Sequence, residues 1–174
     1  MTYFQRFWAQ ILFLVLSVIG VAISIYLTTA HYENAPVVCS NTGIINCERV
    51  LSSPYSYVPG TSIPISLPGL LWFLAFGVVA FLAWRVWPER KPLIIAEVVW
   101  SALGLLTALY LVFVELVHLH NICAWCTSLH IIILVMLLIS VYQLLQWNAR
   151  EYDEYDEEEE TVGATPLSVN SNKD

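Results

Sequence analysis

The chain has 174 residues, of which 58% are hydrophobic and only 12% charged, and this composition excludes an ordinary soluble domain. The net charge of −7 is local, because residues 151–160 carry eight acids whereas residues 1–150 hold five acids against six Lys and Arg. We therefore expect a membrane protein with an acidic tail, and the charge implies no nucleic-acid partner.

The first apolar run lies at about residues 9–30 and follows Arg6. Its end, Thr28-Thr29-Ala30, resembles the cleavage site of a secretory signal peptide. However, its apolar part of about 20 residues is longer than a usual signal core. We interpret the run as a first membrane helix.

Residues 31–66 are polar and turn-rich, and they contain two cysteines, Cys39 and Cys47. A polar segment of this length between two membrane helices indicates a loop with a function. Within it, Asn46 is placed to cap a short helix that begins at Cys47, since Asn is a favoured helix N-cap. Cys47 would then lie at a helix N-terminus.

Three further apolar runs follow, at about residues 67–87, 93–119 and 123–147. Each is long enough to cross a hydrocarbon layer of about 30 Å as a helix. The sequence therefore predicts an all-α membrane protein. Residues 1–150 would form a four-helix transmembrane bundle, and residues 151–174 a disordered acidic tail.

Basic residues predict the orientation of this bundle, because short loops rich in Lys and Arg stay in the cytoplasm. Only one of the six in the body, Arg49, lies in the 31–66 loop; the others flank the opposite helix ends, namely Arg6, Arg85, Arg90, Lys91 and Arg150. We expect a multi-pass plasma (inner) membrane protein with both termini cytoplasmic. All four cysteines would then lie on the periplasmic or extracellular side, where disulfides persist.

Cys123 and Cys126 open the last apolar run and are three residues apart, so they share one face of a helix. A Cys-x-x-Cys pair at a helix N-terminus favours the reactive thiolate, which makes it a candidate redox centre. Two cysteine pairs on one side of a membrane favour exchange between them. Because the chain has no nucleotide-binding fingerprint and no cluster motif, a membrane quinone inside the bundle is a plausible acceptor.

Two alternatives come from other classes of protein. His118, His120, Cys123 and Cys126 have nitrogen and sulfur ligands at close spacing, which is compatible with a zinc-binding scaffold. The cysteines would otherwise form disulfides that only brace the outer loop of a non-catalytic tetraspan protein. A stoichiometric zinc would favour the first alternative, and a single fixed cysteine pairing would favour the second.

Glu97, Glu115 and His130 are ionisable residues within the apolar runs. Glu97 is expected to extend to the cytoplasmic surface. Glu115 and His118 would form either an interfacial pair or a proton path, and we expect the pair. His130 lies one turn below Cys126, where its imidazole would either contact a quinone or be satisfied by a neighbouring helix.

The combined spacing resembles one known family, the vitamin K epoxide reductase family. The similarity spans roughly residues 9–147 and rests on Cys39-x7-Cys47, Ser53, Gly69 and Cys123-Ala-Trp-Cys126. The resemblance implies a four-helix bundle around a quinone such as menaquinone or ubiquinone. It also implies that electrons are relayed from a protein partner through the loop pair to the Cys-x-x-Cys pair.

Carried over by position, the resemblance assigns a role to each cysteine. Cys126 would face the quinone, Cys123 would exchange with Cys47, and Cys39 would meet the partner. Ser53 would hydrogen-bond near the quinone ring.

The chain departs from the vertebrate members at two positions. Ile65 stands near the place of a quinone-contacting Asn, and His130 stands in place of a Tyr. These differences favour simple quinone reduction over epoxide reduction. The expected function is that of a quinone-dependent thiol-disulfide oxidoreductase that oxidises a separate thioredoxin-like protein on the outer side and so supports disulfide formation.

Overall fold

The structure, a computed structural model, describes residues 3–33, 35–39, 42–85 and 91–163, with the side chains of residues 3–6 and 153–163 excepted. The described chain consists of helices and isolated bridges, without a β-strand, which confirms the all-α prediction. In chain order its elements are α1 (Tyr3–Glu33), α2 (Cys47–Leu51), the 3-10 turn η1 (Pro54–Ser56), α3 (Ser66–Arg85), α4 (Lys91–Phe113), the π-helix η2 (Val114–Leu119) and α5 (Ala124–Gly163).

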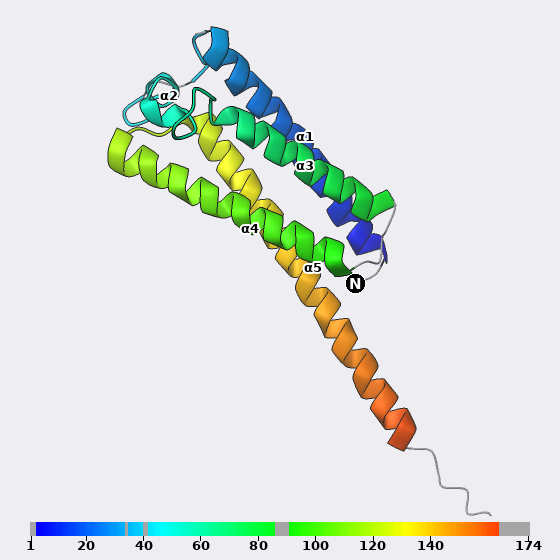
Figure 1. The fold of residues 1–174 in the computed structure, drawn as a ribbon. Coiled ribbons are helices and arrows are strands. Elements are labelled where there is room, and N and C mark those ends of the chain that lie inside the picture. Colours follow the sequence, from blue (N-terminus) through cyan, green and yellow to red (C-terminus); the bar gives the residue numbers. More distant parts are fainter. Residues whose placement is uncertain (1–2, 34, 40–41, 86–90, 164–174) are drawn as a thin grey trace, which may run out of the picture.

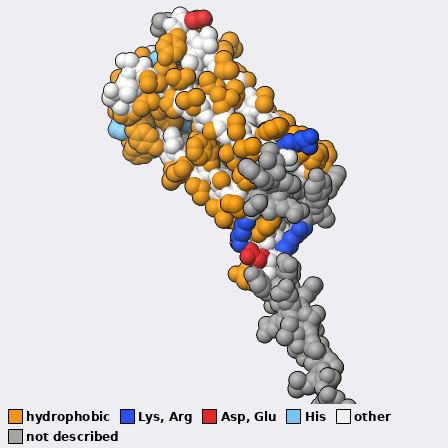
Figure 2. All heavy atoms as spheres, turned by 45° about the vertical axis from the view of Figure 1, so that its right-hand side comes forward, with side chains coloured by type: hydrophobic (Ala, Val, Ile, Leu, Met, Phe, Trp, Pro, Cys, Tyr) orange, Lys and Arg blue, Asp and Glu red, His pale blue; other side chains and the backbone are white. Residues whose placement is uncertain are grey.

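Four helical segments are long and apolar enough to cross a membrane, as the sequence predicted. They are Phe7–Glu33, Ser66–Arg85, Lys91–Leu119 and Ala124–Tyr152. Hydrophobic side chains cover most of the visible surface of the bundle (Figure 2). Such a surface is suited to lipid rather than to water, so the protein is a multi-pass membrane protein.

The bundle is built from two helix pairs, in which α1 packs along α3 and α4 packs along α5 (Figure 1). Small residues allow the first pair to approach closely, as is common between membrane helices. At Gly20 of α1, a Cβ atom would collide with the ring of Phe73 on α3. The ring of Phe73 therefore lies directly against the backbone of α1.

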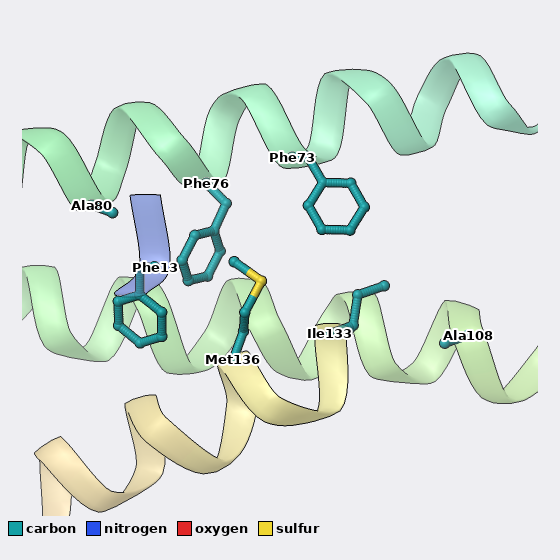
Figure 3. Close-up of a cluster of buried hydrophobic side chains, with 7 residues drawn as sticks. All are labelled: Phe13, Phe73, Phe76, Ala80, Ala108, Ile133 and Met136. Carbon is teal, nitrogen blue, oxygen red and sulfur yellow. The ribbon is translucent and has the colours of Figure 1, made fainter. Parts of the chain in front are cut away.

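Aromatic and aliphatic side chains fill the middle of the bundle. Phe13 of α1 and Phe76 of α3 meet edge to face, with ring centroids 5.2 Å apart, and Met136 of α5 points toward both (Figure 3). The cluster comprises Phe13, Phe73, Phe76, Ala80, Ala108, Ile133 and Met136, so all four long helices contribute to one core.

A buried polar cluster lies on the side of this core nearer the N-terminus. The Gln10 side-chain nitrogen donates to Glu97 Oε2 at 3.3 Å and to Gln143 Oε1 at 3.4 Å. Glu97 is fully buried, so the prediction that it extends to the surface was wrong. Two amides from helices distant in the sequence provide a polar environment that makes such an extension unnecessary.

The last helix is longer than expected. α5 continues to Gly163 and projects beyond the bundle (Figure 1), so residues 151–163, which we expected to be disordered, are helical. An ion pair between Lys91 and Glu151, 2.5 Å apart, joins the start of α4 to α5 where the latter leaves the bundle. Residues 164–174 of the expected tail lie outside the described residues.

Candidate redox site

The loop after α1 is fixed to the start of α5 by backbone hydrogen bonds. The Ile122 N–H donates to the Ile44 carbonyl at 2.8 Å, and the Asn46 N–H donates to the Ile122 carbonyl at 3.1 Å. These bonds set Cys47, the first residue of α2, beside Cys123, the residue before α5. Both cysteine side chains are fully buried in one cluster with Val50.

The short helix α2 forms as its sequence predicts. Asn46 has extended backbone angles, and its side-chain oxygen accepts a hydrogen bond from the Arg49 N–H at 2.9 Å, which is the N-cap arrangement. Cys47 is bonded to Cys39 in a disulfide, with 6.1 Å between the Cα atoms. Because Cys39 is half-buried, it is the more accessible sulfur of this pair.

Trp125, between the two cysteines of the Cys-x-x-Cys pair, holds the segment that leads to Cys39. Its indole N–H donates to the Val38 carbonyl at 2.8 Å, and its ring packs on Tyr26 with centroids 5.2 Å apart. The Tyr26 hydroxyl in turn accepts a hydrogen bond from the Val38 N–H at 3.0 Å. Both backbone polar groups of Val38 are thus bound by side chains from α1 and α5.

Cys123 and Cys126 are free thiols that contact each other at the N-terminus of α5. The Cys126 N–H lies 3.4 Å from Cys123 Sγ. A hydrogen bond donated by the Cys126 thiol lowers the pKa of Cys123, against the burial that raises it. Cys123 is therefore the member of the pair that is prepared to be a thiolate.

Glu115 turns toward this dithiol from η2. Its carboxylate accepts a hydrogen bond from the Cys123 N–H, at 3.5 Å, and lies beside the Cys126 thiol. We had expected an interfacial pair with His118, and that was wrong. His118 instead is exposed and stacks on Tyr55, with ring centroids 5.3 Å apart.

Glu115 turns inward because it continues the buried face of α4, on which Glu97 and Ala108 lie at helical spacing. The chain widens from an α-helix to a π-helix at Val114, and the left-handed residue His120, with φ 49°, ends it. The Glu115 carbonyl accepts the N–H groups of both His120 and Asn121. The sequence signal for this residue was an acid in an apolar run close to the dithiol, at helical spacing from Glu97.

A cavity of about 220 Å³ lies below the dithiol, among the ends of the four long helices nearest α2. Its lining is mostly apolar and includes Trp72, Phe73, Leu129 and Ile133, with the Cys126 side chain at one end. His130 also lines it, and the buried His130 Nδ1 has no hydrogen-bond partner among the described residues. An apolar cavity with a few convergent polar groups is the usual form of a small-molecule site.

Comparison with known proteins agrees with this geometry. Residues 11–141 match the vitamin K epoxide reductase family. The chain belongs to this family. No individual curated protein matches the chain. Family membership makes the protein a membrane thiol oxidoreductase, and the disulfide next to a free dithiol is the arrangement that such chemistry requires.

Five of the six residues that the vitamin K epoxide reductase resemblance singled out meet at this site, and Ser53 lies apart from the cavity lining. The Ser53 hydroxyl donates to the Val50 carbonyl at 2.7 Å and so closes α2. Ser56, one turn of η1 later, lines the cavity instead. Spacing alone did not separate the two, because both serines are buried and both precede the second membrane helix.

The zinc alternative has no support among the described residues. Across the residues that the structure describes, no three His, Cys, Asp or Glu side chains are grouped to hold a metal ion. His118 stacks on Tyr55, and His120 is exposed at the end of η2.

Proposed function

We propose that this protein is a quinone-dependent thiol-disulfide oxidoreductase that oxidises a separate thioredoxin-like protein. One observation carries the proposal: Cys126 lines an apolar cavity, while Cys123 is buried against Cys47. A dithiol between a disulfide and a cavity has a donor on one side and room for an acceptor on the other.

Electrons would enter at the loop disulfide. A thiolate of the partner attacks Cys39, the accessible sulfur, and the second partner thiol then resolves the mixed disulfide and leaves Cys39 and Cys47 reduced. Cys47 next attacks Cys123 of an oxidised Cys123–Cys126 pair, which releases Cys126 as a thiolate. Cys39 closes the loop disulfide again, and Cys123 and Cys126 remain as two thiols.

The cavity suits a quinone such as menaquinone or ubiquinone. Such a ring supplies a planar, apolar acceptor of two electrons and two protons. Trp72 and Phe73 would hold the ring between helices, and the unpaired His130 nitrogen would hydrogen-bond one of its oxygens. Ile65, where a hydrogen-bonding Asn would suit an epoxide, also lines the cavity, which favours simple quinone reduction.

The charge distribution supports an outward-facing dithiol in the plasma membrane. Lys and Arg side chains gather around the end of the bundle from which α5 projects (Figure 2), and Arg85, Lys91 and Arg150 are at that end. By the positive-inside rule this end is cytoplasmic, so the cysteines face the periplasm or the cell exterior.

The test is a single turnover without oxygen. Protein whose Cys123 and Cys126 are reduced is mixed with a short-chain ubiquinone or menaquinone, and the ultraviolet spectrum is followed while remaining thiols are counted. We expect one quinone reduced for each two thiols lost. Thiols that persist beside unreacted quinone would refute the proposal, and a matched sample with both thiols alkylated gives the background.

A further inference from the structure

We propose that Glu115 is a catalytic base that accepts the Cys126 proton when Cys123 and Cys126 close their disulfide. This inference rests on the proposed function, since it concerns the oxidation of the same dithiol. It assigns to a residue of the third membrane helix a part in chemistry that the cysteines would otherwise carry out alone.

Contact with a reacting group is the first observation. The Glu115 carboxylate accepts the Cys123 N–H at 3.5 Å and lies beside the Cys126 thiol, and the side chain is 5% exposed. In a buried site, a carboxylate next to the thiol can remove its proton without the help of water.

The titratable groups around the Glu115 carboxylate are the dithiol, two histidines and the cysteines of the loop disulfide. Cys123 and Cys126 face it from the start of α5. On its own helix, His118 stacks on Tyr55 and His120 is exposed, while Cys47 of α2 is bonded in a disulfide. The base and its proton donor thus form a local unit.

The backbone around Glu115 is the second observation. A π-helix interrupts the i to i+4 ladder only here in the described chain, and such interruptions are frequent at functional sites. The left-handed His120 follows at its end, a conformation uncommon for a residue other than glycine. Glu115 itself continues the buried face of α4, on which Glu97 and Ala108 lie, so the π-helix marks this position and does not create it.

The proposed step balances in atoms and electrons. The Cys126 S–H bond breaks and its proton moves to Glu115, and Cys123 gives up its own proton to the aqueous side before the step, which its lowered pKa favours. The S–S bond between Cys123 and Cys126 forms, and two electrons leave to a quinone or another two-electron oxidant. Glu115 returns its proton to the aqueous side, and the oxidant takes up two protons.

A purely structural role for Glu115 predicts a different result from a role as a base, and the two can be separated by a substitution. Glu115 also accepts the Cys123 N–H, and a glutamine oxygen would serve that purpose equally well. Glu115→Gln therefore keeps the shape and the backbone hydrogen bond but removes the base. Glu97→Gln is the matched control, because Glu97 is a buried acid on the same membrane segment and lies away from the dithiol.

The experiment measures how fast reduced Cys123 and Cys126 become a disulfide in purified protein between pH 6 and pH 9. Diamide, a thiol oxidant, is used in one series and a short-chain quinone in the other. We expect Glu115→Gln to be about 100-fold slower than the wild type near pH 6.5, within the usual contribution of a general base. Its rate should rise with pH as solvent takes over, and the gap between it and the wild type or Glu97→Gln should narrow toward pH 9.

If Glu115→Gln formed the disulfide at the wild-type rate and with the wild-type pH profile, the inference would be overturned. Because diamide needs no quinone site, a wild type that reacts with diamide but not with quinone would refute the proposed function and leave the inference standing. Should Glu115→Gln fail to keep its loop disulfide, Glu115→Asp carries the test. We expect Glu115→Asp to oxidise more slowly than the wild type at every pH, with the pH profile of the wild type. An unchanged rate in Glu115→Asp would contradict the role of Glu115 as a base.

Discussion

The indole nitrogen of Trp125 donates a hydrogen bond to the carbonyl oxygen of Val38 over 2.8 Å. This bond connects the segment before Cys39 to the helix that follows Cys123, so a residue inside the Cys-x-x-Cys motif holds the loop disulfide in place. The motif therefore contributes to the position of both cysteine pairs.

We predict that Trp125→Phe slows exchange between the two cysteine pairs by about tenfold, while small dithiols still support quinone reduction. The phenyl ring keeps the packing on Tyr26 but lacks the N–H, and a lost hydrogen bond of this kind costs about 1 kcal/mol. Quenched alkylation with mass spectrometry follows the exchange. Tyr26→Phe removes the hydroxyl that binds the Val38 N–H and should have a similar effect. Equal loss of quinone reduction with the protein partner and with small dithiols would contradict this role of Trp125.

The two cysteine pairs should separate by substrate. Cys126→Ala is expected to abolish quinone reduction with every donor, because this sulfur lines the cavity. Cys39→Ala should mainly stop oxidation of the protein partner and spare small dithiols. Quinone absorbance is the measurement for both variants. Equal loss with both donors in Cys39→Ala would reverse the proposed order, and a single fixed disulfide pairing in all trapped samples would exclude a relay.

The two serines before α3 should have different effects. Ser56→Ala is expected to raise the quinone concentration needed for half-maximal rate several-fold, because Ser56 lines the cavity. Ser53→Ala should instead lower thermal stability by about 1 kcal/mol, since it removes the hydroxyl bonded to the Val50 carbonyl. Steady-state rates and unfolding in detergent distinguish the two variants. If the quinone concentration needed for half-maximal rate rose in Ser53→Ala and not in Ser56→Ala, Ser53 would be the serine that contacts the quinone.

The lowered pKa of Cys123 predicts a pH dependence with a definite sign. The Cys126 thiol is its main cause, so the Cys123 thiolate persists to lower pH than an ordinary cysteine and is lost only below its lowered pKa. In Cys126→Ala, thiolate absorbance near 240 nm should therefore appear at a higher pH than in Cys126→Ser, whose hydroxyl still donates. A variant without Cys39 and Cys47 gives a clean titration. Coincident curves would show that the hydrogen bond has no effect.

Much of the fold could be predicted because it depends on local properties of the chain. Four apolar runs of sufficient length became four membrane-length helices, since a spanning segment must satisfy its own backbone hydrogen bonds. Asn46 capped α2 because its side chain reaches an N–H only three residues away. The cysteine spacing with the family resemblance also located the dithiol, and the match over residues 11–141 agrees.

Only the tertiary structure decided where the polar side chains within those helices point. Glu97 is buried where Gln10, 87 positions away in the sequence, donates both to its carboxylate and to Gln143 of α5. Glu115 faces the dithiol because the turn after η2 brings Cys123 back to its carboxylate, and Ser56 rather than Ser53 lines the cavity because the Ser53 hydroxyl closes α2. The sequence thus determined which segments become helices and where the dithiol lies. The partner of each buried polar group depended on contacts between segments distant in the sequence, which local spacing does not encode.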